Sequence, residues 1–337
     1  MAARLNYLDN LKVALTFLVI FHHAGQAYGY GGEWAYTPSN PAEVMPWIWH
    51  FFSTNAAFFM GLYFFISGYF VPGSYDRQGF GTFLRKKTLR LGVPLLLMGG
   101  GLSVAVGRIE VAHMWFVESL LLFSLLYAAV QKVRPDAAPA RQSRPTLPGL
   151  CLAAAAMGIG SFFIRMASPQ DNWVSLLFCK FEPAHYLQYA MMFILGAASY
   201  RLGWLDRMSN RTGGAALLIG CALAIGNYAR QGGAWNDFVW QWFGIYESFM
   251  CIFISAGLLW LFRKKVNVGN GALSWLSAQS YGAYILHLPL MLGIQYLSDG
   301  VWMGAFGKFM FIGVATTVLS FALTWLLRML PGVRHVL

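Results

Sequence analysis

Two adjacent histidines, His22 and His23, stand in the middle of a long apolar segment near the N-terminus. Ionisable residues inside a membrane-length apolar segment are costly, so they are candidates for function. Lys12 lies eleven positions before His23, which places the two side chains about 20° apart around a helix and roughly 16 Å apart along it. His22 is about 80° from the direction of Lys12. We therefore pair His23 with Lys12 and predict a supporting, substrate-binding role for His22.

Three more ionisable residues interrupt later apolar segments, namely Glu118, Glu247 and His287. Each also has a structural explanation. The two glutamates lie near expected helix ends, where interfacial water would solvate them, and His287 precedes Pro289, which frees a backbone carbonyl that a histidine can bind. We keep Glu118 as a second catalytic candidate and His287 as a substrate-binding candidate.

A basic run contains Arg85, Lys87 and Arg90. Such a run commonly sets membrane topology and contacts anionic lipid headgroups. Lys87 and Arg90 also form an i, i+3 pair on a helix, which could hold a phosphate-rich ligand.

These residue types suit acyl transfer from a thioester to a hydroxyl group. That reaction needs a base for the hydroxyl proton and donors for the tetrahedral oxyanion, and a neutral histidine in a water-poor site can be the base. The sequence contains no GxSxG elbow and no Ser-His-Asp signature, which favours direct transfer over an acyl-enzyme. A metal is not expected, because His22 and His23 point to different faces and no HExxH spacing occurs.

The elements that must position these residues are membrane helices. Hydrophobic residues make up 58% of the 337 residues and charged residues 11%, with a mean hydropathy of +0.53. This composition predicts an all-α, polytopic membrane helix bundle with residues 1–337 in a single domain. The net charge of +11 does not indicate nucleic-acid binding, because the basic residues are dispersed between apolar segments. We expect ten spans, at about 11–30, 48–71, 90–108, 114–131, 147–166, 184–201, 213–230, 241–262, 277–297 and 305–328.

The distribution of charge supports that number of spans. With a cytoplasmic N-terminus, every Lys and Arg falls on the inner side except Arg108, Arg165, Lys180, Arg230 and Lys308. This arrangement follows the positive-inside rule and predicts that both termini are cytoplasmic. Most tryptophans, including Trp34 and Trp115, fall toward the expected outer side. They are either interfacial belt residues or a stacking platform for an external ligand such as a sugar.

Five blocks of sequence together resemble the integral-membrane acyltransferase family 3, closest to its glucan succinyltransferase and surface-polysaccharide O-acyltransferase branch. The first block is Tyr7-Leu-Asp-Asn-Leu-Lys12 followed by His23, which matches the family's Arg/Lys-x10-His signature. The others are Phe64–Phe70, Lys87-x-x-Arg90 with Pro94, His113-Met-Trp-Phe-Val-Glu118, and Ser280–Pro289.

The resemblance implies a multi-pass enzyme of the bacterial inner membrane that moves an acetyl or succinyl group from cytoplasmic acyl-CoA to an extracytoplasmic glycan or another hydroxyl acceptor. His23 would be the base and Lys12 would orient the donor, while Arg85, Lys87 and Arg90 would face the CoA phosphates. Glu118 and His287 would be partners in the membrane interior, and Trp34 and Trp115 would meet the acceptor.

Two departures from the family pattern leave alternatives open. Many members have Arg where this chain has Lys12, and Asp9 lies one turn earlier, so Lys12 either binds donor or pairs with Asp9. The chain ends soon after its tenth expected span, so we expect no fused extracytoplasmic SGNH-type domain.

A transporter or flippase of a small or lipid-linked solute is the competing function, although the chain lacks the repeat symmetry of most secondary carriers.

Overall fold

The computed structural model describes residues 5–29, 34–101, 112–134, 142–170, 172–176, 179–230 and 232–337. The chain divides into two compact units, which are described separately below. Unit 1 combines Met1–Ala56 with Val266–His335, and unit 2 is Ala57–Lys265.

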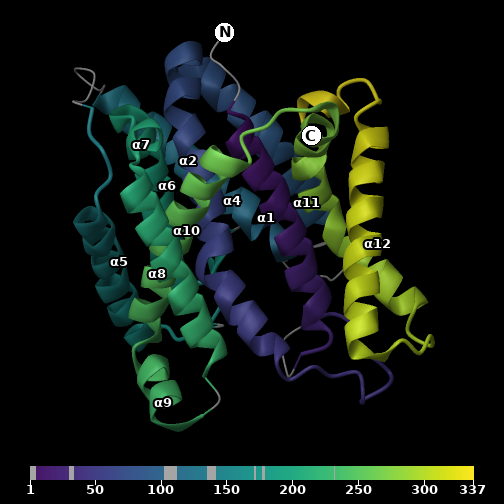
Figure 1. Cartoon of the computed structure of the whole chain (residues 1–337). Helices are drawn as coiled ribbons and strands as arrows, with labels where there is room; N and C mark the ends of the chain where they lie inside the picture. Colours follow the sequence, from purple (N-terminus) through teal and green to yellow (C-terminus); the bar gives the residue numbers. More distant parts are fainter. Residues whose placement is uncertain are drawn as a thin grey trace. The chain divides into compact units, whose positions relative to one another are not determined.

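Unit 1 is a group of helices drawn from both ends of the chain. Figure 1 shows α1 in purple beside α11, with α12 in yellow. Its core consists of apolar side chains from each of these helices and from the start of α2, including Ile20, Ile48, Met291 and Ile312. Its elements are α1 (Asn6–Gln26), the start of α2 (Ile48–Lys87), α11 (Gly271–Leu297), α12 (Gly304–Leu327) and the short η4 (Val333–His335).

Asparagines join the start of α1 to the chain that enters α11. The amide of buried Asn10 donates to the carbonyls of Val266 and Val268 at 2.7 and 2.9 Å. Asn270 caps α11 by accepting a hydrogen bond from the Leu273 backbone nitrogen at 2.8 Å. These contacts hold the N-terminal helix against a segment more than 250 residues away in the sequence.

Unit 2 is also mainly helical. In Figure 1, α5, α6, α8 and α10 run beside one another, with α9 at one end. Its elements are the rest of α2, η1 (Thr88–Gly92), η2 (Leu95–Gly100), η3 (Ala112–Met114), α4 (Trp115–Val133), α5 (Leu147–Ala167), β1 (Val174–Leu176), β2 (Cys179–Phe181), α6 (Pro183–Leu202), α7 (Trp204–Arg207), α8 (Asn210–Tyr228), α9 (Gly233–Gln241) and α10 (Phe243–Lys265).

Glycines allow α2 and α6 to cross with their backbones in contact. A Cβ atom added to Gly68 would lie 2.1 Å from the carbonyl oxygen of Phe193, and one added to Gly196 would lie 2.0 Å from that of Phe65. Small residues at helix crossings are how membrane helices approach closely. The crossing therefore requires glycine on both helices.

Five helical segments in the described part of the chain are long and apolar enough to cross a membrane, which makes this a multi-pass membrane protein. They are Ile48–Gly100, Ala112–Val133, Leu147–Ala167, Phe243–Lys265 and Gly304–Leu327, and the bent pair α8 and α9 is a sixth candidate. Helix α1 is long enough, but its two histidines, Asp9 and Lys12 lower its mean hydropathy. The ten spans and the two cytoplasmic termini stay predictions.

The predicted break between residues 71 and 90 lies within α2. The backbone is non-helical at Gly79, with φ 69° and ψ 169°, so two helical stretches meet there at a kink. A positive φ of this size suits glycine. Helical structure resumes after the kink and continues through η1 and η2 to Gly100.

The predicted helical class is confirmed, with one small strand pair added. The strands β1 and β2 form a small antiparallel hairpin between α5 and α6, with Val174 opposite Phe181. Residues 102–108 of the predicted span 90–108 lie outside the described residues.

Candidate active site

The structure brings together two of the predicted site residues, His23 on α1 and His287 on α11, within unit 1. His23 Nδ1 lies 3.0 Å from His287 Nε2, and His287 Nδ1 lies 2.5 Å from the carbonyl oxygen of Tyr284. His287 is fully buried and His23 is half-buried. His287 thus binds a backbone carbonyl, but that of Tyr284 and not that of Ile285, which Pro289 leaves without its i→i−4 donor. The contact with His23 adds a second role.

This chain of contacts assigns the protons on both rings. A carbonyl oxygen only accepts hydrogen bonds, so His287 Nδ1 carries a proton, and Nε2 of the neutral ring holds a lone pair. His23 Nδ1 must then donate to that lone pair. In neutral His23 the second lone pair is therefore on Nε2, the nitrogen that can act as a base.

Trp34, predicted to meet the acceptor, lies against the same histidine. The indole stacks on the His23 ring with the centroids 5.8 Å apart and an angle of 18° between the planes. Its Nε1 donates to Gln295 Oε1 at 3.0 Å. Close by, the hydroxyl of Tyr296 donates to the carbonyl of Ala35 at 2.9 Å. The end of α11 thus holds the tryptophan over the His23 ring.

The segment that carries Trp34 is anchored by Asp299, in the loop between α11 and α12. The carboxylate of Asp299 accepts hydrogen bonds from the hydroxyls of Ser39 and Tyr36 and, at 3.1 Å, from the Ser39 backbone nitrogen. The bonds from Ser39 and then Tyr36 lower the pKa of Asp299 to about 2.

A buried ion pair completes the anchor. Lys308 Nζ lies 2.9 Å from Glu43 Oε2, with both side chains excluded from solvent, and donates to the Asp299 carbonyl at 2.7 Å. The charge distribution predicted only an outer-side position for Lys308, so its structural role was missed.

His22 faces away from this contact. It is buried, and its ring packs against Phe52 and Phe51 with centroids 5.1 and 6.5 Å away. His22 therefore packs α1, which also carries His23, against the start of α2. Its predicted contact with substrate stays a prediction.

Lys12 forms the ion pair that the sequence analysis left open. Its Nζ lies 2.8 Å from Asp9 Oδ1, and the side chains are 32% and 17% exposed. The charge of Lys12 therefore has a counter-ion within α1, which reduces its attraction for an anionic donor.

The remaining predicted residues belong to unit 2. Trp115 stacks on Tyr189 with centroids 5.2 Å apart. Glu118 is buried and accepts a hydrogen bond from the Lys180 backbone nitrogen at 3.3 Å, so it is held inside the unit and is not displayed to interfacial water.

The basic run lies at the end of α2 and in η1. Arg85 and Arg90 are exposed, and Lys87 is half-buried with its ammonium 5.6 Å from the centre of the Phe83 ring. The role of these residues in donor binding stays a prediction.

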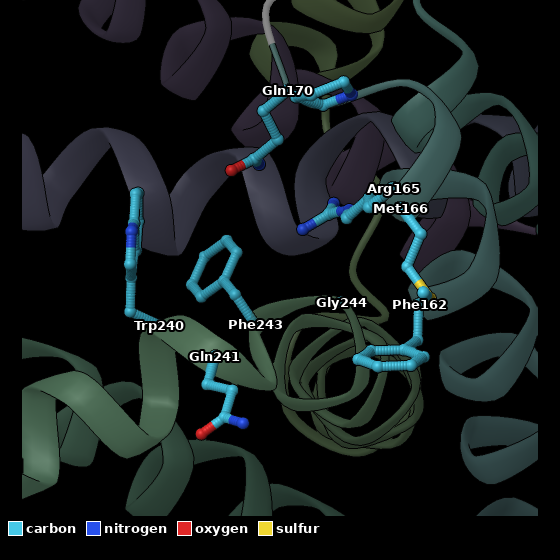
Figure 2. Close-up of a pocket in the computed structure, with 9 residues that line it drawn as sticks. Phe162, Arg165, Met166, Gln170, Trp240, Gln241, Phe243 and Gly244 are labelled. Atoms are coloured by element: carbon cyan, nitrogen blue, oxygen red, sulfur yellow. The ribbon is translucent and has the colours of Figure 1, made fainter.

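A buried ionic network in unit 2 was missed. His185 Nδ1 lies 2.7 Å from Glu182 Oε2 and His185 Nε2 lies 3.1 Å from Glu247 Oε1, while Arg165 pairs with the other oxygen of Glu247. Glu182 and His185 are spaced i, i+3 at the start of a span, which is a signal that could have indicated the pair. A cavity of about 230 Å³ lies beside Arg165 (Figure 2).

The comparisons with known proteins address the chain as a whole. The Acyl_transf_3 family, described as an acyltransferase domain, matches residues 5–325. No match was found among curated proteins or solved structures. The match covers nearly the whole chain and includes both His23 and His287. The chain therefore belongs to acyltransferase family 3 and is a membrane acyltransferase.

Proposed function

We propose that this protein is an O-acyltransferase of the bacterial inner membrane. It moves an acetyl or succinyl group from acyl-CoA to a hydroxyl of an extracytoplasmic acceptor, in the first place a carbohydrate. The hydrogen-bond chain from Tyr284 through His287 to His23 is the observation that carries the proposal, because it leaves Nε2 of His23 as the basic nitrogen.

The reaction follows from that proton arrangement. His23 Nε2 takes the proton of the acceptor hydroxyl while its oxygen attacks the thioester carbonyl carbon. The tetrahedral intermediate then collapses, the C–S bond breaks, and CoA leaves as the thiolate. His23 returns its proton to the sulfur, so no acyl-enzyme forms and the base ends as it began.

Trp34 supports this role in two ways. Stacked on the ring, it restricts rotation of a half-buried imidazole, and it covers one face of that imidazole from water. The donor carries its charge on phosphates, for which we propose Lys87, Arg90 and Arg85 as the binding group.

The test is transfer by purified protein in nanodiscs supplied with radiolabelled acetyl-CoA or succinyl-CoA and a polysaccharide acceptor. His23→Ala should lower the rate of CoA release and acyl transfer at least about a hundredfold, the usual contribution of a general base. The matched control is His50→Ala, the same change at a half-buried histidine of α2, which should keep the wild-type rate.

Transfer that survives in a folded His23→Ala protein would overturn the mechanism. The competing transporter would move an unmodified solute without releasing CoA, which the same assay detects by following free thiol.

A further inference from the structure

The cavity beside the missed ionic network is lined by groups that bind sugars. Three aromatic rings, Phe162, Trp240 and Phe243, border it together with the side-chain amides of Gln170 and Gln241. Figure 2 shows Phe243 between Trp240 and the guanidinium of Arg165, with the two amides on different sides of the cavity. Aromatic faces stack on the apolar face of a sugar ring, and amides both donate to and accept from hydroxyls.

The size of the cavity limits the ligand. Its volume of about 230 Å³ is below the usual range of roughly 300–1,000 Å³ for pockets that hold drug-sized molecules. The space suits a single sugar ring.

The ionic network beside the cavity is balanced in charge. Both nitrogens of His185 face carboxylate oxygens, of Glu182 and Glu247. Carboxylates only accept hydrogen bonds, so both nitrogens carry protons and the ring is a cation. With Arg165, the network has two positive and two negative charges.

Arg230 adds a positive charge that this network does not offset. Its guanidinium carbon lies 5.4 Å from the centre of Phe243 and 5.9 Å from that of Trp240, two of the rings that line the cavity. The side chain is only 4% exposed, and its Nε donates to the neutral amide of Asn227 at 3.0 Å. Its Nη2 is buried with no hydrogen-bond partner among the described residues.

A buried cation without a counter-ion is unfavourable, and a bound anion would offset that cost. Arg165 also has its Nε buried without a described partner, although its terminal nitrogen pairs with Glu247. Asp237 is the carboxylate on the neighbouring helix α9, and it is exposed to solvent, where its field is screened.

We propose that this cavity binds an acidic sugar residue, one ring bearing a carboxylate, as part of the acceptor. That the sugar belongs to the acceptor rests on the proposed function, but binding of the sugar does not depend on catalysis. The ring stacks on the aromatic side chains, the amides bind its hydroxyls, and the carboxylate is attracted to Arg165 and Arg230.

The test is calorimetric titration of the protein in nanodiscs, without donor, using methyl β-D-glucuronide and methyl β-D-glucoside, which differ only in the carboxylate. The glucuronide should bind about tenfold more tightly, the effect of a charge-assisted interaction. Trp240→Ala should weaken its binding about three- to tenfold. Trp302→Ala, the same change at an exposed tryptophan outside the cavity, should leave binding unchanged.

Arg230→Gln separates a binding role from a structural one. It should remove the preference for the glucuronide while leaving the affinity for the glucoside unchanged, whereas loss of a purely structural contact would weaken the binding of both glycosides. Arg230→Lys should keep part of the preference.

Three results would overturn the inference: no binding of the glucuronide, equal affinity for the two glycosides, or succinate binding as tightly as the glucuronide. The last would show a site for the carboxylate of a succinyl group alone. Repeating the titration with His23→Ala separates the two proposals, because binding should persist there even if transfer is absent in every assay.

Discussion

Replacement of His287 by Phe tests the proton arrangement at the candidate active site. Phenylalanine fills a similar volume but offers no acceptor to His23 Nδ1, which lies 3.0 Å from His287 Nε2. Without that acceptor, His23 is free to carry its proton on either nitrogen, and only one of the two forms presents the basic Nε2. The variant should therefore lower kcat and leave the KM for the donor nearly unchanged.

The size of the effect follows from the strength of one hydrogen bond. A neutral intramolecular hydrogen bond contributes about 0.5–1.5 kcal/mol net, which corresponds to a change of about 2- to 13-fold in the ratio of the two tautomers. When neither nitrogen is favoured, the reactive tautomer falls from nearly the whole population to about half of it, so we expect His287→Phe to lose about twofold in kcat. His23→Ala removes the base itself and should lose at least about a hundredfold.

Two further variants show whether His287 acts through His23. His287→Gln should retain most of kcat, because its amide oxygen can accept from Nδ1 while its NH₂ group donates to the Tyr284 carbonyl. The double variant, with His23→Ala and His287→Phe, should be no slower than His23→Ala alone. Wild-type kcat in a folded His287→Phe protein, or additive losses in the double variant, would refute the reasoning.

The remaining predictions concern stability. Gly68→Ala forces a Cβ into the backbone of α6 and should lower the free energy of unfolding by about 1–3 kcal/mol or more. The control Gly81→Ala, on the same helix with open space around it, should leave that free energy unchanged. Equal melting temperatures for the two variants would contradict the close crossing. Lys308→Met leaves the carboxylate of Glu43 buried alone and should lower the free energy of unfolding by about 3–5 kcal/mol. Adding Glu43→Gln should recover part of that loss. A Lys308→Met protein as stable as the wild type would argue against the buried pair. Because the pKa of Asp299 is lowered to about 2, its contribution to the stability of the anchored segment is complete above about pH 4 and is lost as the pH falls through 2. Limited proteolysis of the 34–47 segment should show that transition, and Asp299→Asn should abolish it.

The sequence predicted the features of unit 1 that depend on residues close together in one helix. Periodicity placed Lys12 and His23 on one face of α1. The i, i+3 spacing gave the pair between Lys12 and Asp9 as one of two alternatives, and the structure contains that pair. These features depend on residues within three turns of one helix, so a single sequence contains the information.

The contacts that assemble the site were not predicted, because they join distant segments. His23 and His287 are 264 positions apart, and each was identified separately as an ionisable residue in an apolar segment. Nothing in one sequence indicates which buried groups face each other. The same reason explains why Glu247 and Arg165 were considered individually while the network through His185 was missed.

The ion pair on α1 also changes what salt should do to the enzyme. Lys12 is offset by Asp9, so attraction of the CoA phosphates falls to exposed groups such as Arg85 and Arg90. Interactions between exposed charges are screened within about 10 Å at 0.1 M salt, whereas a hydrogen bond between His23 and buried His287 is not. Raising NaCl from 0.05 to 0.5 M, an illustrative range of about tenfold, should therefore raise the KM for acyl-CoA several-fold and leave kcat unchanged. Potassium glutamate at matched ionic strength controls for a specific effect of chloride. A KM that is insensitive to salt would show that the phosphates bind at a desolvated site, and would return Lys12 to consideration as the donor-binding residue.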